Sequence, residues 1–195
     1  MKGLNDDSHA TPLDLNELKG LVPTHITNRG ELNRLENDNI LEAEAWAANT
    51  RNERIIDQGF VMKLHKHMYD QVWRWAGTFR RTDKNIGVAW QQVPQDLAHL
   101  MADVRGWVEH SSYGANEICI RLHHKLVWIH PFPNGNGRHA RLMADLVAQK
   151  QFHIERFSWG AQSAKKPDSM RKEYIRSLQS ADAGDYEPLL VFARS

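Results

Sequence analysis

The sequence predicts a mainly α-helical fold built as one domain, and three observations lead to this prediction. Apolar residues recur at helical spacing over several long stretches, most clearly in residues 93–110. The chain has 195 residues, of which 41% are hydrophobic and 25% charged, and this size and composition suit one domain with a proper core. Only residues 77–88 break the helical period, with Thr, Phe, Ile and Val around polar turn residues. We therefore expect a helical bundle that carries one small β-hairpin.

The first part of the chain is expected to hold little regular structure. Residues 1–11 are polar and are expected to be flexible, and the single domain is expected over 12–195. A turn or short helix follows through Leu18. Thr24 and Thr27 then lie in a loop and are candidate helix caps.

The apolar spacing predicts the other helices. Each is bounded by Gly, Pro or a short polar turn, which are the usual stop signals. The expected helices are 31–49, 57–75, 93–110, 117–129, 138–151, 170–179 and 188–194.

Composition excludes some classes of function. The formal net charge is +1, so no global field favours nucleic acid or an anionic membrane as a partner. Cys119 is the only cysteine, which rules out an internal disulfide and fits a reducing compartment. The start of the chain is unlike a signal peptide and no apolar run reaches membrane-spanning length, so we expect a cytoplasmic protein.

The segment 130–141 is the candidate functional site. It reads as a loop followed by the N-terminus of a helix, where unpaired N–H groups and the helix dipole favour an anion. Gly135 and Gly137 allow a ligand to come close to the backbone. Arg138 and Arg141 are three residues apart and so share one helical face. Together these features predict a phosphate-binding site.

His130 lies at the start of this segment and is a candidate proton acceptor near neutral pH. Taken alone, a Gly-Asn-Gly run is a turn signal and a histidine before proline is usually structural. The combination within one short segment favours a functional site.

The segment also resembles the signature of the Fic (filamentation induced by cAMP) family, His-x-Phe-x-Asp/Glu-Gly-Asn-Gly-Arg-x-x-Arg. Asn134 departs from it, because it stands where the family usually has Asp or Glu. The resemblance runs from about Thr11 to the C-terminus, and residues 21–33 are similar to the branch called mobile mystery protein B. It implies the Fic fold, with the hairpin as a flap over the active site. The matching residues are His130, Phe132, Gly135, Asn136, Gly137, Arg138 and Arg141.

The resemblance implies the transfer of AMP from ATP to a Ser, Thr or Tyr hydroxyl of a protein. His130 would be the general base, and Phe132 a buried anchor of the loop. Arg138 would neutralise the β-phosphate and Arg141 the γ-phosphate. The remaining phosphate-binding groups would be Asn136 and the amides of Gly135 and Gly137.

Asn134 bears on the metal that the resemblance implies. The family acid binds Mg²⁺, whereas Asn134 offers a neutral carbonyl oxygen and would be a weaker ligand. Slow transfer, another nucleotide or another phosphate-containing donor are the alternatives that this change leaves open.

A second Fic motif, Ser/Thr-x-x-x-Glu-Gly/Asn, is inhibitory in many relatives. Residues 27–33 are similar to it, with Leu32 in place of Gly. The resemblance would place Glu31, on an inhibitory-type helical segment at about 27–50, against Arg141, where its carboxylate would block the γ-phosphate. Glu36 is a second candidate. The alternative for Glu31 is a first-turn carboxylate favoured by the helix dipole.

The resemblance also suggests partners and alternative activities. A target protein would dock on the 77–92 flap as an added strand, and an antitoxin-like partner and a homodimer are left open. The alternatives to transfer are a nucleotide-binding regulatory module without activity and a hydrolase that removes AMP.

Overall fold

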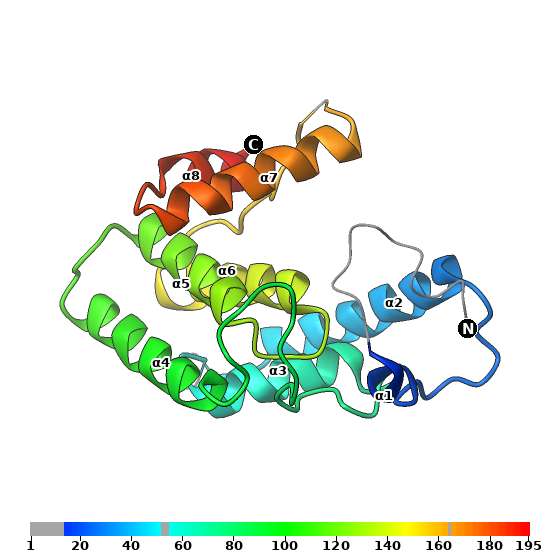
Figure 1. Ribbon diagram of the computed structural model, residues 1–195. Helices are drawn as coiled ribbons and strands as arrows, with labels where there is room; N and C mark the ends of the chain where they lie inside the picture. The colour runs from blue at the N-terminus through cyan, green and yellow to red at the C-terminus, as the bar shows by residue number, and fades with distance from the viewer. Residues whose placement is uncertain (1–13, 52–54, 164) are drawn as a thin grey trace.

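The computed structural model describes residues 14–51, 55–163 and 165–195 and confirms the mainly α-helical fold. The prediction for residues 1–11 lies outside these ranges. Most helices lie close to their predicted positions (Figure 1). They are α1 (Leu15–Leu18), α2 (Arg29–Ala48), α3 (Gln58–Tyr69), α4 (Val93–Glu109), α5 (Ala115–Ile129), α6 (Asn136–Gln151), α7 (Pro167–Asp182) and α8 (Glu187–Arg194).

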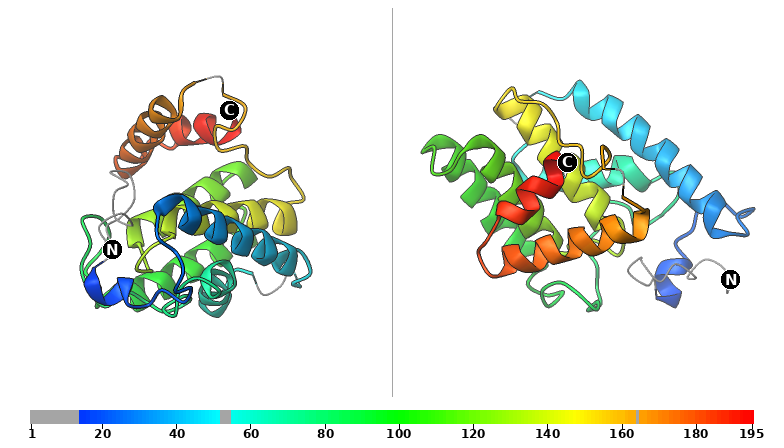
Figure 2. Two further views of the ribbon diagram at one scale, coloured as in Figure 1. Left: turned by 90° about the vertical axis from the view of Figure 1, so that its right-hand side faces the viewer. Right: turned by 90° about the horizontal axis from the view of Figure 1, so that it is seen from above.

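The helices α5 and α6 form the centre of the molecule and pack against each other. α4 contacts α5, and α2 and α3 lie together on one side (Figure 1). α7 and α8 pack against each other and lie above the other helices in Figure 1 and in the left view of Figure 2. The motif segment connects α5 to α6, so the core holds it in the middle of the fold.

The core explains why α6 is central. From Ala140 to Ala148, every residue of α6 except Arg141 is buried. A helix that is apolar around most of its circumference needs partners on several sides. α3 and α5 supply buried surfaces for it, among them Leu64 and Leu122, which are fully buried. Within the described ranges, no helix combines the length and apolar content that crossing a bilayer requires.

The helix predicted over 57–75 ends earlier, at Tyr69. The reason is that the chain after it pairs with the segment that follows α1. Val22 N–H donates to the Val72 carbonyl at 2.9 Å, and Arg74 N–H donates to the Gly20 carbonyl at 2.8 Å. This pairing, with its isolated bridge at Trp73, satisfies backbone groups that the helix would otherwise have used.

The two strands predicted for the hairpin do not form. Residues 77–92, which the structure describes throughout, consist of turns, bends and extended segments. A buried side chain replaces strand pairing, because the Arg80 guanidinium donates to several backbone carbonyls of this segment and of the chain beside it. These carbonyls belong to Thr82, Val88, Ile129 and His130. The segment nevertheless lies in front of α5 and α6, near the motif (Figure 1).

Candidate active site

His130 is the C-cap of α5 and adopts the left-handed conformation, with φ of 53° and ψ of 61°. Pro131 follows it and cannot continue the helix. The carbonyl of His130 accepts from Nε of Arg80 at 2.6 Å, which fixes this turn of the backbone. Strained backbone of this kind is typical of functional residues held by their surroundings.

The protonation state of His130 suits a proton acceptor. Only 4% of the residue is exposed. Burial, assisted by the positive charges of Arg80 and Lys84, lowers the pKa of His130 to about 4, although a bond to the Val127 backbone opposes the shift. The imidazole is therefore neutral at pH 7 and can accept a proton.

Asn136 closes the motif loop. Its Oδ1 accepts from the Phe132 N–H at 2.9 Å and its Nδ2 donates to the Phe132 carbonyl at 2.8 Å. The side chain is buried, and the residue also lines the large cavity of the site. A contact of Asn136 with phosphate oxygens stays a prediction, because these two bonds leave one N–H and one lone pair of the carboxamide unused. The buried anchor predicted at Phe132 is confirmed.

The two glycines of the motif differ. Gly135 has φ of 77°, and a Cβ there would lie 2.6 Å from the Tyr69 ring. Its N–H donates to Oδ1 of Asn134 at 2.7 Å, and the predicted contact of this amide with a phosphate stays a prediction. A Cβ on Gly137 would meet nothing within 4 Å, and this residue lines a large cavity. Gly137 is therefore the position where a ligand can approach the backbone.

Arg138 bonds to Glu36 rather than standing alone. Its Nη2 lies 2.6 Å from Oε2 of Glu36, and the other carboxylate oxygen accepts from Nε1 of Trp73 at 2.7 Å. Glu36 is only 2% exposed, so its charge lies in a poorly solvated site where the arginine is its cationic partner. The guanidinium also lies 5.2 Å from the ring centre of Tyr69.

Glu31 does not reach Arg141, which corrects the predicted pair. Its carboxylate accepts from the Thr27 N–H at 3.0 Å, and this bond lowers the pKa of the carboxyl group. The side chain of Asn28, not of Thr24 or Thr27, caps α2 by accepting from the Glu31 N–H. The first turn of α2 thus uses the Glu31 N–H for the Asn28 cap and the Glu31 carboxylate for the residue before that cap.

Arg141 lies against aromatic residues on the other side of the site. Its guanidinium is 4.7 Å from the ring centre of Tyr174 and 5.8 Å from that of Trp159. Tyr174 Oη lies 3.0 Å from Nε2 of His123, which is buried on α5. The arginine is therefore held by α7 and by the chain that follows α6.

These residues surround one cavity of about 1060 Å³. The predicted catalytic and phosphate-binding residues all line it, whereas Glu31, Glu36 and Phe132 do not. This volume is at the upper end of the range for ligand sites in proteins, so a nucleotide and part of a second substrate fit inside it. The predicted residues in its wall are His130, Asn134, Gly135, Asn136, Gly137, Arg138 and Arg141.

Sequence reasoning missed several residues of the wall. Arg29, Asn33 and Asn37 line the cavity from α2. Their four-residue spacing places them on one helical face, and this signal could have been found in the sequence. Tyr174 and Trp159 carry no comparable signal, because only the folded chain brings them to Arg141.

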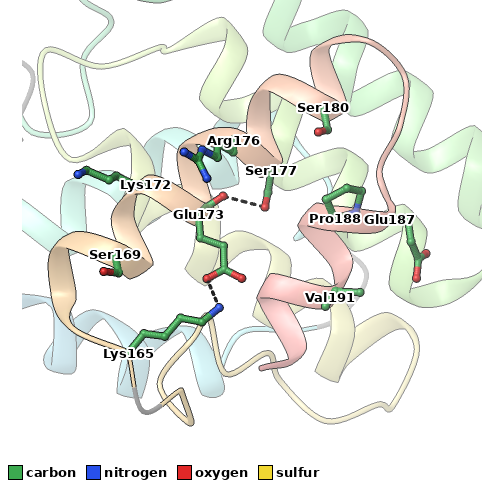
Figure 3. A pocket seen from close by; sticks show the side chains of 10 residues that line it. All are labelled: Lys165, Ser169, Lys172, Glu173, Arg176, Ser177, Ser180, Glu187, Pro188 and Val191. Atoms are coloured by element: carbon green, nitrogen blue, oxygen red, sulfur yellow. Dashed lines mark hydrogen bonds and ion pairs between the residues drawn. The ribbon is translucent and has the colours of Figure 1, made fainter.

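A second hollow, of about 770 Å³, lies between α7 and α8 and contains none of the predicted residues (Figure 3). Lys165 and Glu173 form an ion pair across part of it, at 2.6 Å. Lys172 and Arg176 also line it, as Figure 3 shows. The motif residues place the candidate active site in the larger cavity.

Metal ligands are scarce at this site. Within the described parts of the chain, no group of three or more His, Cys, Asp or Glu residues is arranged to hold a metal ion. Asn134 Oδ1 is the predicted ligand, and it already accepts from Gly135 N–H. A carboxamide oxygen has two lone pairs, so this bond does not exclude a metal.

The fold and the site together define a helical domain in which a histidine, a glycine-rich turn and two arginines meet at a helix N-terminus. Residues 55–148 match the model of the Fic/DOC family, so the chain contains a domain of this family. Two similar solved structures support the same fold. The BepC effector of Bartonella tribocorum, with bound AMPPNP, has a TM-score of 0.69 at 14% identity and covers 93% of this chain and 97% of that one. A fragment of Fic-1 from C. elegans has a TM-score of 0.67 at 23% identity and covers 90% and 51%.

Curated relatives share more of the sequence. The protein adenylyltransferase Fic of Drosophila melanogaster is 32% identical over 137 residues, which cover 68% of this chain and 26% of the relative. The protein adenylyltransferase fic-1 of Caenorhabditis briggsae is 32% identical over 120 residues, covering 60% and 22%. The chain thus spans about a quarter of the length of these relatives.

Proposed function

We propose that this protein transfers AMP from ATP to a Ser, Thr or Tyr hydroxyl of a target protein. One observation carries the proposal: a buried, neutral His130 shares a single cavity with Arg138 and Arg141. The relatives named protein adenylyltransferase support the same reaction. The two motif arginines that line the cavity suit a substrate with several phosphates.

In this reaction His130 takes the proton of the target hydroxyl. The hydroxyl oxygen then forms a bond to the α-phosphorus, while the bond from that phosphorus to the bridging oxygen of the β-phosphate breaks and pyrophosphate leaves. Such transfers depend mainly on the positions of the reactants and on charge stabilisation. The N-terminus of α6, at Gly137 and Arg138, supplies backbone amides and positive charge for the phosphates.

Mg²⁺ would arrive with the nucleotide phosphates and add positive charge that offsets theirs. Asn134 is the residue that would contact it, as one neutral oxygen ligand among phosphate and water oxygens. The residue roles described here do not depend on the metal.

We propose further that the site is autoinhibited and that Glu36 is the inhibitory residue. Its carboxylate already binds Arg138, the cation that a phosphate would need. Arg–carboxylate and Arg–phosphate contacts use the same donors and therefore compete. Glu31 is bound to Thr27 and is not part of this competition.

The target is proposed to dock along residues 77–92, beside His130. Ile86 and Gly87 line the cavity, and Ile86 is 47% exposed. Two basic residues of this segment are engaged within the protein, because Arg80 is buried and Lys84 bonds to Glu17 at 2.6 Å. The cytoplasmic location stays a prediction from the sequence, and an antitoxin-like partner and a homodimer stay predictions.

The test is transfer of label from ATP labelled on the α-phosphate. His130→Ala should abolish labelling of a lysate and of the protein itself, because the substitution removes the imidazole that is proposed to accept the proton. His99→Ala, an exposed histidine of α4, is the matched control and should label like wild type. Intact mass after incubation with each nucleotide identifies the transferred group.

Equal labelling by wild type and His130→Ala would refute the role of the base. Binding of ATP by calorimetry without any turnover would favour the nucleotide-binding module. A mass increase that differs from that of AMP would show that another group is transferred and would exclude AMP transfer from ATP as the reaction.

A further inference from the structure

His65 makes two directional bonds at the edge of the proposed site. Its Nδ1 accepts from the Gly77 N–H at 3.0 Å, and its Nε2 lies 3.0 Å from the carbonyl oxygen of Asn134. The amide of Gly77 can only donate and the carbonyl of Asn134 can only accept. The ring must therefore carry its proton on Nε2, and one neutral imidazole serves both contacts.

The surroundings of His65 fix this arrangement. The ring is fully buried and stacks on Phe132 with 3.7 Å between ring centres. Burial lowers the pKa of His65 well below its ordinary value, so the ring stays neutral at pH 7. One helical turn further along α3, Tyr69 lies under Gly135. α3 thus supports the motif loop with two adjacent side chains.

The other partner, Gly77, begins the segment that lies over the site. Gly77 has φ of 73°, and a Cβ there would lie 2.6 Å from Cβ of Lys66. The backbone is therefore pressed against α3 at this point. Further along, Gly87 lies so close to the motif that a Cβ would be 2.7 Å from Cβ of His130. His65 thus holds the start of the segment, and Gly87 near its other end lies against His130, the proposed general base.

We propose that His65 is a positioning residue that joins the target-docking segment 77–92 to the nucleotide side of the site at Asn134. This inference rests on the proposed function for the names of the two substrates, but not for the contacts. A movement of Gly77 would displace the His65 imidazole, and the same imidazole donates to the Asn134 carbonyl. The two substrate sites therefore share one polar side chain outside the cavity.

Two substitutions of His65 each remove one of its two hydrogen bonds and keep the other. In His65→Gln the side-chain NH₂ takes the place of Nε2 and can still donate to Asn134, whereas the acceptor for Gly77 is lost. In His65→Asn the side-chain oxygen takes the place of Nδ1 and can still accept from Gly77, whereas the donor to Asn134 is lost. His67→Gln on the same helix is the matched control, because His67 stacks on Trp46 away from the loop.

The expected results differ between the variants. A lost buried hydrogen bond corresponds to roughly a 5- to 150-fold change in an equilibrium. His65→Asn should weaken nucleotide binding by about tenfold in calorimetry and speed amide exchange at 134–137. His65→Gln should leave nucleotide binding within about twofold of wild type and speed exchange at 77–92. Its KM for the target should rise more than its KM for the nucleotide.

Equal loss of nucleotide affinity in both variants, or unchanged amide exchange at 77–92 in His65→Gln, would overturn the proposal. If a variant does not fold, the wild-type protein still tests it. Long-range ¹⁵N–¹H NMR should show the Nε2–H tautomer, and an Nδ1–H tautomer would contradict the geometry. If the two variants show the expected exchange and binding changes but the wild-type protein transfers nothing, the proposed function alone is refuted.

Discussion

The glutamate proposed as inhibitory shows how burial decides what a residue contacts. Glu31 and Glu36 both lie on α2, and a motif spacing favoured Glu31. Glu31 lies in the first turn, where Thr27 binds its carboxylate. Glu36 lies one turn deeper and is buried between Trp73 and Arg138. The sequence therefore identified the helix, but not which of its carboxylates reaches the site.

At the residue scale we predict that Glu36→Gln raises self-modification, because it removes the charge that competes for Arg138. The gain should be about tenfold, in line with one charge-assisted hydrogen bond. Glutamine keeps an acceptor for Trp73, so the fold should survive. Label incorporation from ATP labelled on the α-phosphate measures the effect.

Glu31→Gln is the matched variant and should change self-modification by less than twofold. A gain from Glu31→Gln, with none from Glu36→Gln, would return the inhibitory role to the residue that the motif favoured.

At the scale of elements, the helices were predictable and the segment between α3 and α4 was not. Helices follow from apolar spacing, which local sequence records. The interior of 77–92 depends instead on Arg80, whose guanidinium reaches carbonyls of α5 that are distant in sequence. The segment does contain β-branched residues among polar ones, as a hairpin would. Its backbone carbonyls, however, accept hydrogen bonds from the Arg80 side chain and not from a neighbouring strand.

The turn that begins α6 makes a prediction about its two glycines. Gly135→Ala should lower the free energy of unfolding by at least about 1–2 kcal/mol, because the left-handed backbone and the Tyr69 ring both oppose a methyl group. Gly137→Ala should leave stability equal or higher by up to about 1 kcal/mol, because it lies in a helix with open space beside it. Urea unfolding measures both.

The two glycine substitutions should also differ in their effect on the affinity for nucleotide. Gly137→Ala places its methyl group in the cavity and should weaken binding of ATP in calorimetry even though the protein is stable. Unchanged affinity in Gly137→Ala would show that no ligand approaches this part of the backbone.

At the scale of the whole molecule, the positions of the buried histidines set the response to acid. Burial lowers the pKa of His123 to about 3 and of His130 and His139 to about 4, and it lowers the pKa of His65 as well. In the unfolded chain these groups titrate near 6.5, so between about pH 6.5 and 4 the unfolded state binds more protons.

The free energy of unfolding should therefore be highest above about pH 6.5 and fall as the pH drops toward 4. Each such histidine contributes at most about 1.4 kcal/mol per pH unit within this window. Urea unfolding at several pH values measures the slope, and His139→Gln should reduce it. Stability that is flat or rises between pH 6.5 and 4.5 would contradict the burial of these rings as neutral groups.

The motif and its family were evident from the sequence, because local spacing records both. The wall from α2 left a signal in the spacing of its polar residues but not its position beside the motif, and the wall from α7 left no comparable signal, since Arg29 and Tyr174 are far from the motif along the chain. The family match spans 55–148, yet Glu36 lies before it, and Trp159 and Tyr174 lie after it. The contacts that hold the two motif arginines therefore come from parts of the chain outside the matched segment, so a match to the family model does not by itself predict them.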